Sequence, residues 1–323
     1  MSELTIKQHF VPRAYLKSFS NLHTKDTYRT FSYDKVVGKI IPANILDIAQ
    51  ERFFYDFSDE FVEMYNEHHE ESPIHKQHLE KFFNENETNI GYQMDRINKL
   101  LIEKNISSLT FDEIISNNEV KLCFATFIAL QSIRNPSYRQ LFSNFISFIF
   151  GSENEHDMNE VLFHHLNSGY VDRISDELIN NYYWSIGAII NPGKPKSPLV
   201  DKCYPTDRFI ISDNPVINIQ NVKMKNGQAT RSCIELVLPL NQYMVLILHQ
   251  KNSFISNDNN LIKHMKSNDV RIYNEIQLTN SYRKVIFKDA DIGKKIEKFF
   301  RLQRQYRTKG NGQFIVSATK EDS

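Results

Sequence analysis

Asn-Pro-Gly-Lys-Pro-Lys-Ser-Pro, residues 191–198, is the stretch at which the spacing of apolar residues along the chain changes. Before it, residues 59 to about 190 repeat apolar side chains at the spacing of helices. After it, residues from about 203 to 288 consist of short apolar and β-branched runs separated by turn residues, which is typical of strands. This break therefore predicts a helical region that is followed by a strand-rich region.

Each of these regions is incomplete on its own. Near the N-terminus, Thr27 to Ile41 reads as two further short strands around a turn. Neither half of the chain contains both a complete sheet and the helices to cover it, so we expect each half to bury the other. The sequence thus predicts a single domain, residues 1–323, with an α+β fold: a central helical bundle packed with a mostly antiparallel sheet formed by N-terminal and C-terminal strands. We expect the polar tail, about 306–323, to be flexible.

The composition is that of a packed globular protein. Of 323 residues, 41% are hydrophobic, with 23 Phe and 15 Tyr against 10 Gly and 10 Pro, which argues against intrinsic disorder. The formal net charge of zero excludes a generally basic, DNA-coating surface but leaves a local basic patch open. Cys123, Cys203 and Cys233 are far apart, which argues against a disulfide framework or a cysteine zinc site. Without an apolar signal core or a run of ~20 apolar residues, we expect a cytoplasmic protein with no membrane contact.

The common catalytic motifs are missing from the sequence. There is no GxxxxGK[ST], GxGxxG, GxSxG or HExxH, which argues against a P-loop ATPase, a Rossmann dehydrogenase, an ordinary α/β-hydrolase and a zincin. His68, His69, His75 and His78 form a histidine-rich stretch among several glutamates. We interpret this stretch as a solvated, mildly acidic helix face rather than as a metal site.

Two short segments place polar residues beside hydrophobic anchors. Residues 7–19, Lys-Gln-His-Phe-Val-Pro-Arg-Ala-Tyr-Leu-Lys-Ser-Phe, hold Gln8, His9 and Arg13 among aromatic and aliphatic side chains. Residues 211–216, Ile-Ser-Asp-Asn-Pro-Val, form an acidic turn directly after an apolar strand. Strand ends often display functional side chains, because the sheet holds a short polar loop rigidly. The alternative interpretation of Asp213 and Asn214 is an Asx turn whose side chains satisfy the backbone.

Taken with four further motifs, these segments resemble an uncharacterised family, domain of unknown function 4238. The motifs are His9 to Phe19, Tyr33-Asp-Lys35 with Gly38-Lys39, Ala49 with Glu51, Phe54 and Tyr55, Ala129 with Gln131 and Arg134, Ser212 to Val216, and Pro239-Leu240. The resemblance spans roughly residues 7 to 288. It implies a shared fold and a shared site, but it supplies no reaction.

The motif residues form a chemically coherent set for metal-assisted catalysis. His9, Glu51 and Asp213 would ligate Mg²⁺ or Mn²⁺, which prefer oxygen ligands with an occasional imidazole. Arg134 would hold a phosphate through its guanidinium fork. His9, Glu51, Asp213 and Arg134 are therefore our candidate catalytic residues for a hydrolase that acts on nucleic acid or nucleotides. The other candidates for the same site are Gln131, Asn214, Tyr55 and Glu87.

Other functions stay open. The sequence lacks the acidic-x-Lys strand of common restriction-type nucleases and an HNH metal finger. The main alternative is a non-catalytic binding or sensor module, such as a partner subunit in a bacterial response system, in which His9 and Asp213 pair and staple the N-terminal segment to the sheet. A weaker alternative is a nucleotide-modifying transferase in which Arg134, Tyr55 and Trp184 frame a base.

Overall fold

The computed structural model describes residues 4–25, 27–150, 157–190, 207–225, 228–251, 259–304 and 315–320. Its helices are α1 (Arg13–Leu16), α2 (Asp59–His68), α3 (His78–Glu103), α4 (Phe111–Ile114), α5 (Asn118–Arg134), α6 (Pro136–Phe150), α7 (Met158–Asn167), α8 (Tyr170–Asn181), α10 (Ser267–Asn280) and α11 (Ala290–Leu302). Its strands are β1 (Lys7–His9), β2 (Asn21–Thr24), β3 (Thr27–Asp34), β4 (Lys39–Asn44), β5 (Gln50–Arg52), β6 (Tyr182–Ala188), β7 (Ile211–Ser212), β8 (Ile217–Lys225), β9 (Gln228–Asn241), β10 (Met244–Gln250), β11 (Leu261–His264), β12 (Lys284–Phe287) and β13 (Ile315–Lys320).

The strands form two larger sheets and one small one. A six-stranded sheet has the order β11-β6-β10-β9-β8-β13, and only its two outer strands run parallel to their neighbours. A five-stranded antiparallel sheet joins β2, β3 and β4 from the N-terminal region to β12 and β7 from the C-terminal region. Strands β1 and β5 form an antiparallel pair of their own. The predicted α+β fold, with mostly antiparallel sheets packed against helices, is confirmed, and the five-stranded sheet combines N-terminal and C-terminal strands.

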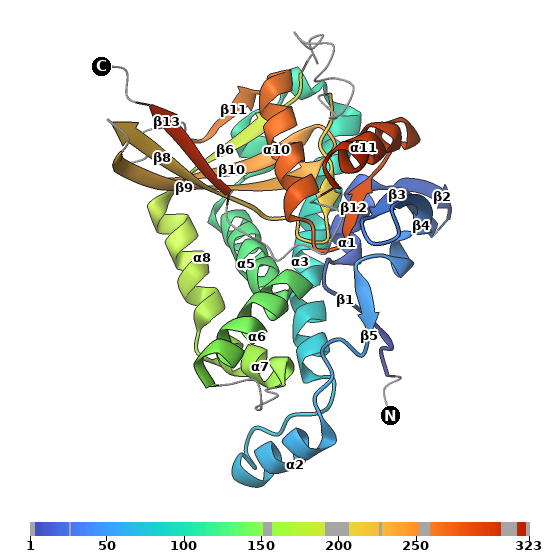
Figure 1. The fold of residues 1–323 in the computed structure, drawn as a ribbon, viewed down its shortest axis with the longest axis vertical. Coiled ribbons are helices and arrows are strands. Elements are labelled where there is room, and N and C mark those ends of the chain that lie inside the picture. Colours follow the sequence, from blue (N-terminus) through green and yellow to red (C-terminus); the bar gives the residue numbers. More distant parts are fainter. Residues whose placement is uncertain are drawn as a thin grey trace.

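The six-stranded sheet is covered by helices on both faces (Figure 1). Successive side chains of a strand point to opposite faces. Leu236 and Leu238 of β9 therefore belong to the large core that contains the helices α3, α5 and α8, whereas Val237 packs with Val270 of α10 on the other face. Because both faces are buried, the central strands read as almost continuous apolar runs.

Helix α5 is the centre of the helical layer. Asn117 caps its first turn by accepting a hydrogen bond from the backbone N–H of Val120, and the helix ends at Arg134 before Pro136 begins α6. It packs between α3 and α8, and buried residues occur around most of its circumference. The cluster to which it belongs extends from Phe10 to Ile286, so it joins both ends of the chain.

Two details of the predicted layout are wrong. Residues 182–188, which we assigned to the helical region, form the strand β6 between β11 and β10. The segment Tyr-Tyr-Trp-Ser-Ile-Gly-Ala is aromatic and almost wholly buried, so its tertiary pairing outweighs the helical spacing that precedes it. Residues 315–320 of the tail that we expected to be flexible form β13, which pairs in parallel with β8. The segment 191–198 and Cys203 lie outside the described residues.

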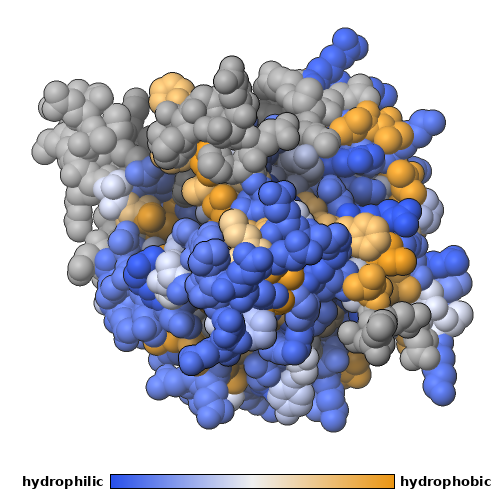
Figure 2. All heavy atoms as spheres, turned by 90° about the horizontal axis from the view of Figure 1, so that it is seen from below, coloured by the Kyte–Doolittle hydropathy of each residue, from blue (hydrophilic) through white to orange (hydrophobic). Residues whose placement is uncertain are grey.

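Three of the four histidines in the histidine-rich stretch are solvated, as predicted, whereas His78 is partly buried, with its ring centroid 5.7 Å from that of Phe163. Helix α2 lies at one end of the molecule (Figure 1), and the view onto that end is mostly hydrophilic (Figure 2). His68 and His69 are exposed, and each ring Nδ1 lies within hydrogen-bond distance of the carbonyl oxygen four residues earlier. His75 is also exposed. Within the described ranges, no helix combines the length and the hydrophobicity that crossing a membrane requires.

Candidate functional site

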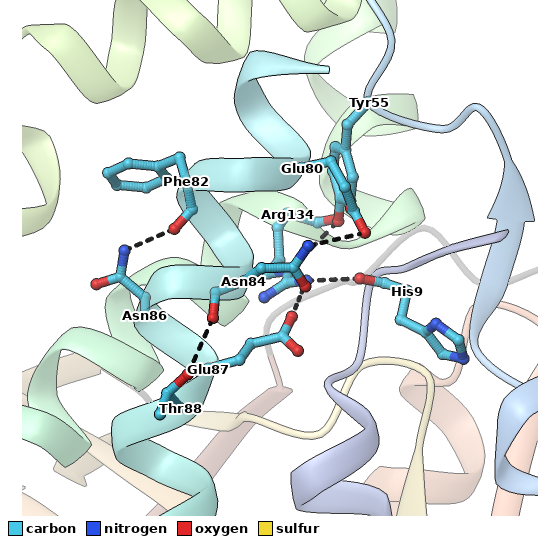
Figure 3. A network of polar contacts seen from close by, with 9 residues as sticks. All are labelled: His9, Tyr55, Glu80, Phe82, Asn84, Asn86, Glu87, Thr88 and Arg134. Atoms are coloured by element: carbon cyan, nitrogen blue, oxygen red, sulfur yellow. Dashed lines mark hydrogen bonds and ion pairs between the residues drawn. The ribbon is translucent and has the colours of Figure 1, made fainter. Parts of the chain in front are cut away.

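Arg134, the last residue of α5, lies at the centre of a buried polar network (Figure 3). Its side chain is 1% exposed. One terminal nitrogen, Nη2, donates to the backbone oxygen of His9 at 2.5 Å and to Oε1 of Glu87 at 2.8 Å. Nε donates to the hydroxyl of Tyr55 at 3.3 Å, and this hydroxyl donates to the Arg134 carbonyl oxygen at 3.0 Å. The network therefore ties α5 to α3, β1 and the segment after β5.

The network is positioned by local structure on each element. Glu80 and Glu87 lie two turns apart on α3 and so face the same side of that helix. Gln8 of β1 fixes Tyr55, because its side-chain oxygen accepts from the Tyr55 backbone N–H at 2.5 Å. The guanidinium of Arg134 lies 4.4 Å from the centroid of the Phe83 ring, which is also on α3.

The electrostatics of the network follow from burial and from its mixed charges. Burial lowers the pKa of Arg134, but Tyr55 and Glu87 outweigh this and raise it, so the guanidinium stays charged. Burial raises the pKa of Glu80 to about 7, and the neighbouring Glu87 adds to the increase while Arg134 opposes it. The Glu80 carboxyl group therefore gains or loses its proton near neutral pH.

His9 contributes its backbone rather than its imidazole to this network. Burial, followed by the charge of Arg13, lowers the pKa of His9 to about 4, so the ring is neutral at pH 7. Its Nε2 lies 3.3 Å from the carbonyl oxygen of Ile45. Figure 3 shows the ring turned away from Arg134, while the carbonyl points towards it.

Asp213 has a different set of partners. Its carboxylate accepts hydrogen bonds from the backbone N–H groups of Tyr282, Arg283 and Lys284 at 2.8, 2.7 and 2.7 Å. Burial raises the pKa of Asp213 to about 6, while these N–H groups and the charge of Lys35 oppose the increase. The carboxylate therefore holds the turn before β12 against the end of β7, which supports the interpretation of Asp213 as a structural acceptor.

The structure brings together only part of the predicted site. His9, Tyr55, Glu87 and Arg134 meet in the network just described, whereas Glu51, Asp213 and Asn214 lie outside it. Gln131 is one turn before Arg134 and fully buried, and neither of its amide atoms has a hydrogen-bond partner in the described chain.

The predicted metal site is not assembled. In the ranges that the structure describes, no three His, Cys, Asp or Glu side chains are placed to hold a metal ion. His9 and Asp213 contact different segments, so the pairing predicted for the binding-module alternative is not observed. Glu51 and Asp213 share Arg283 as a neighbour. A hydrogen bond to Asp34 raises the pKa of Arg283, and burial opposes this increase. The charges of Glu51 and Asp213 add to it. Glu51 itself is exposed on β5. The predicted metal ligands do not converge because the Asp213 carboxylate already accepts hydrogen bonds from backbone N–H groups and the His9 ring is buried near positively charged side chains.

Two hollows flank the network and meet at Glu87 and Thr88 of α3. The larger, of about 870 Å³, lies between α3 and α5, and Arg134 lines it. The smaller, of about 490 Å³, is lined by Arg13, Lys17, Asn84 and residues of the segment 44–46, among others. Together we call them the α3 cleft.

Sequence reasoning missed Glu80 and Lys17. The seven-residue separation of Glu80 from Glu87 is the signal that could have found Glu80, because it places both carboxyl groups on one helix face. Lys17 follows Arg13 by four residues, and this spacing is the signal that could have found Lys17 as a second cation at the smaller hollow.

Comparison with known proteins identifies the family of this chain. The family model described as Protein of unknown function (DUF4238) matches residues 7–291. The chain belongs to this family. Neither the curated proteins nor the solved structures yield a match. The resemblance that the motifs indicated is therefore confirmed for most of the chain, and membership brings no reaction with it.

Proposed function

We propose that this DUF4238 protein is a non-catalytic binding or sensor protein, and that its ligand is a nucleotide held in the α3 cleft. The observation that carries the proposal is a pair of cations without a carboxylate partner. Arg13 and Lys17 line the smaller hollow, and neither forms an ion pair with a described residue. Lys17 lies over the Tyr28 ring, with 5.3 Å between its Nζ and the ring centroid.

The two hollows differ in chemistry in a way that suits a nucleotide. The smaller offers a guanidinium and an ammonium, which bind phosphate oxygens by charge-assisted hydrogen bonds. The larger offers side-chain amides, including Asn89, Gln93 and Asn117, beside the apolar residue Phe127. Its volume lies within the range of about 300–1,000 Å³ that is common for ligand sites. The phosphate of a nucleotide would bind in the smaller hollow, and its uncharged nucleoside part would bind in the larger hollow on the other side of Glu87.

The proposed role is binding because the predicted catalytic groups are committed elsewhere. The His9 ring is neutral and buried, Asp213 serves three backbone donors, and Arg134 is shared among Glu87, Tyr55 and a backbone oxygen. A rigid network beneath a cleft favours preorganised binding.

Isothermal titration calorimetry with the four common nucleoside 5′-monophosphates, and with the matching nucleosides, tests this proposal. We expect at least one monophosphate to bind, and the Arg13→Gln/Lys17→Gln variant to bind it at least about tenfold more weakly, as the loss of charge-assisted bonds requires. Lys294→Gln/Lys298→Gln is the matched control, since these lysines lie four residues apart on α11. Absence of binding by every monophosphate, or equal binding by the Arg13/Lys17 variant, would refute the proposal.

A hydrolase acting on nucleotides is the second candidate. Burial raises the pKa of Glu80 to about 7, and Glu80 lies two turns before Glu87, which lines both hollows, so Glu80 could act as a general acid near neutral pH. Chromatography of the same mixtures, with and without Mg²⁺, distinguishes the two functions. If the wild type converts a nucleotide and Glu80→Gln does not, the result would favour the hydrolase. If the wild type leaves every nucleotide unchanged, the result would favour binding alone.

A further inference from the structure

A second cavity lies on the opposite side of α5 from the α3 cleft. Its volume is about 290 Å³, it is partly open to solvent, and it is lined by residues of α5, α6, α8, β8 and β9 together with Tyr182 of β6 and Asn280 of α10. Ala129 and Ser132 of α5 line it, whereas Leu130 and Arg134 line the α3 cleft, so the two sites use different faces of the helix. The linings share no residue. We call this second site the α6 cavity.

Unsatisfied polar atoms in the wall of the α6 cavity point to a ligand. Ser137 is 2% exposed, and its Oγ has no hydrogen-bond partner within the described ranges. The same holds for Oδ1 of Asn218 on β8. Buried polar groups in proteins are almost always paired, so each such atom requires an explanation. A bound molecule that carries a donor and an acceptor would satisfy both.

Asn214 adds a third polar group from the Ser-Asp-Asn-Pro-Val motif. Its backbone N–H donates to Oγ of Ser212, and that hydroxyl lies 2.9 Å from the Asn214 carbonyl oxygen and 2.6 Å from Oε1 of Gln277. Its side-chain amide lines the cavity and makes no hydrogen bond with a described residue. By contrast, Ser132 and Asn135 also line the cavity, but their side chains already bond to the backbone of α5.

The rest of the wall is aromatic and aliphatic. Tyr138, Tyr170 and Tyr182 contribute rings, and Leu178 and Leu236 contribute aliphatic surface. Glu177 is the one Asp, Glu, Lys or Arg in the lining. A cavity with one acidic group and no basic group disfavours an anionic ligand, and tyrosine rings favour a flat one.

We propose that the α6 cavity binds a small, uncharged, planar molecule of the nucleobase class, whose amide-like edge bonds to Ser137, Asn214 and Asn218. The ring stacks against the tyrosines, and the edge supplies the donor and acceptor that the wall lacks. This site does not depend on nucleotide binding in the α3 cleft.

Saturation-transfer NMR and calorimetry on the full chain, with adenine, cytosine, uracil and hypoxanthine as probes, test the inference. We expect at least one base to bind, and the Ser137→Ala/Asn214→Ala variant to raise its dissociation constant at least tenfold. Ser72→Ala is the control, because Ser72 is exposed beside α2. Ser137→Ala should also leave the melting temperature unchanged or raise it, since it deletes an unpaired buried hydroxyl.

The outcomes separate this inference from the proposed function. Base binding that persists in Arg13→Gln/Lys17→Gln but weakens in Ser137→Ala/Asn214→Ala supports the α6 cavity. Binding that is equal in wild type and Ser137→Ala/Asn214→Ala overturns it and places the base elsewhere. No binding by any of the four bases also overturns it, and the cavity then holds water only.

Discussion

Replacing Arg134 by methionine should destabilise the protein strongly. The substitution removes the guanidinium but keeps most of the side-chain volume, so the effect reports on polar contacts rather than on a cavity. It leaves Glu87, whose side chain is 18% exposed, without its cation, and it leaves the His9 carbonyl and the Tyr55 hydroxyl without a donor.

The expected magnitude follows from these lost partners. Removing one member of a buried ion pair costs about 3–5 kcal/mol, because the remaining charge stays buried and uncompensated. Arg134 is 1% exposed, so solvent does little to reduce this cost. The lost guanidinium charge also raises the pKa of Glu80 further, since Arg134 lowers it in the wild type. We therefore expect a loss of about 3–5 kcal/mol in the free energy of unfolding at pH 7.

Urea unfolding followed by circular dichroism measures this loss, and a double-mutant cycle assigns it to the ion pair. Glu87→Leu in the Arg134→Met background should cost less than the sum of the two single changes, with a coupling of about 0.5–3 kcal/mol. Arg271→Met is the matched control, because the ion pair of Arg271 with Glu275 is partly exposed and such pairs contribute about 0–1 kcal/mol. An Arg134→Met loss no larger than that of the control would refute the reasoning, as would a coupling of zero.

Two further predictions concern His9 and Asp213. The depressed pKa of His9 means that its contribution to stability is present above pH 6.5 and is lost as the pH falls towards 4. Between pH 7 and 4 the wild type should therefore lose about 3 kcal/mol more unfolding free energy than His9→Gln. The contributions of Glu80 and Asp213, whose raised pKa values act in the opposite direction, are common to both proteins and cancel in this difference. Parallel pH profiles of the two proteins would contradict the prediction. Asp213→Ala should lower the melting temperature, because it leaves three partly buried backbone N–H groups without their acceptor, each at a cost of up to about 1–3 kcal/mol. The control is Asp291→Ala, whose side chain is 69% exposed, and an unchanged or higher melting temperature for Asp213→Ala would instead indicate a strained functional carboxylate.

The helix-to-strand change around residues 191–198 predicted the α+β class correctly because apolar periodicity is a local property of the chain. The same reasoning failed at β6, where Trp184 and its neighbours are buried between two other strands. Burial on both faces removes the alternation that marks a strand, so a short apolar run after a helix carries no signal of its own state.

The site was predicted less completely than the fold. The motif residues Arg134 and Tyr55 do meet the further candidate Glu87, but the partner that joins them to β1 is the backbone oxygen of His9, and a backbone oxygen has no sequence signature. Asp213 was selected for its carboxylate, yet that carboxylate binds backbone N–H groups some 70 residues later in the chain. Metal ligation was inferred from residue types, and types do not specify which atoms face one another.

The sequence by itself determined the fold class and the family, because apolar periodicity and short motifs depend on neighbouring residues. Only the tertiary structure decided which polar groups are partners, which of them are neutral, and which cavities remain. These properties depend on burial and on contacts between segments as far apart as β1 and α5. A carboxylate or an imidazole acquires its protonation state and its role from the groups that folding places around it.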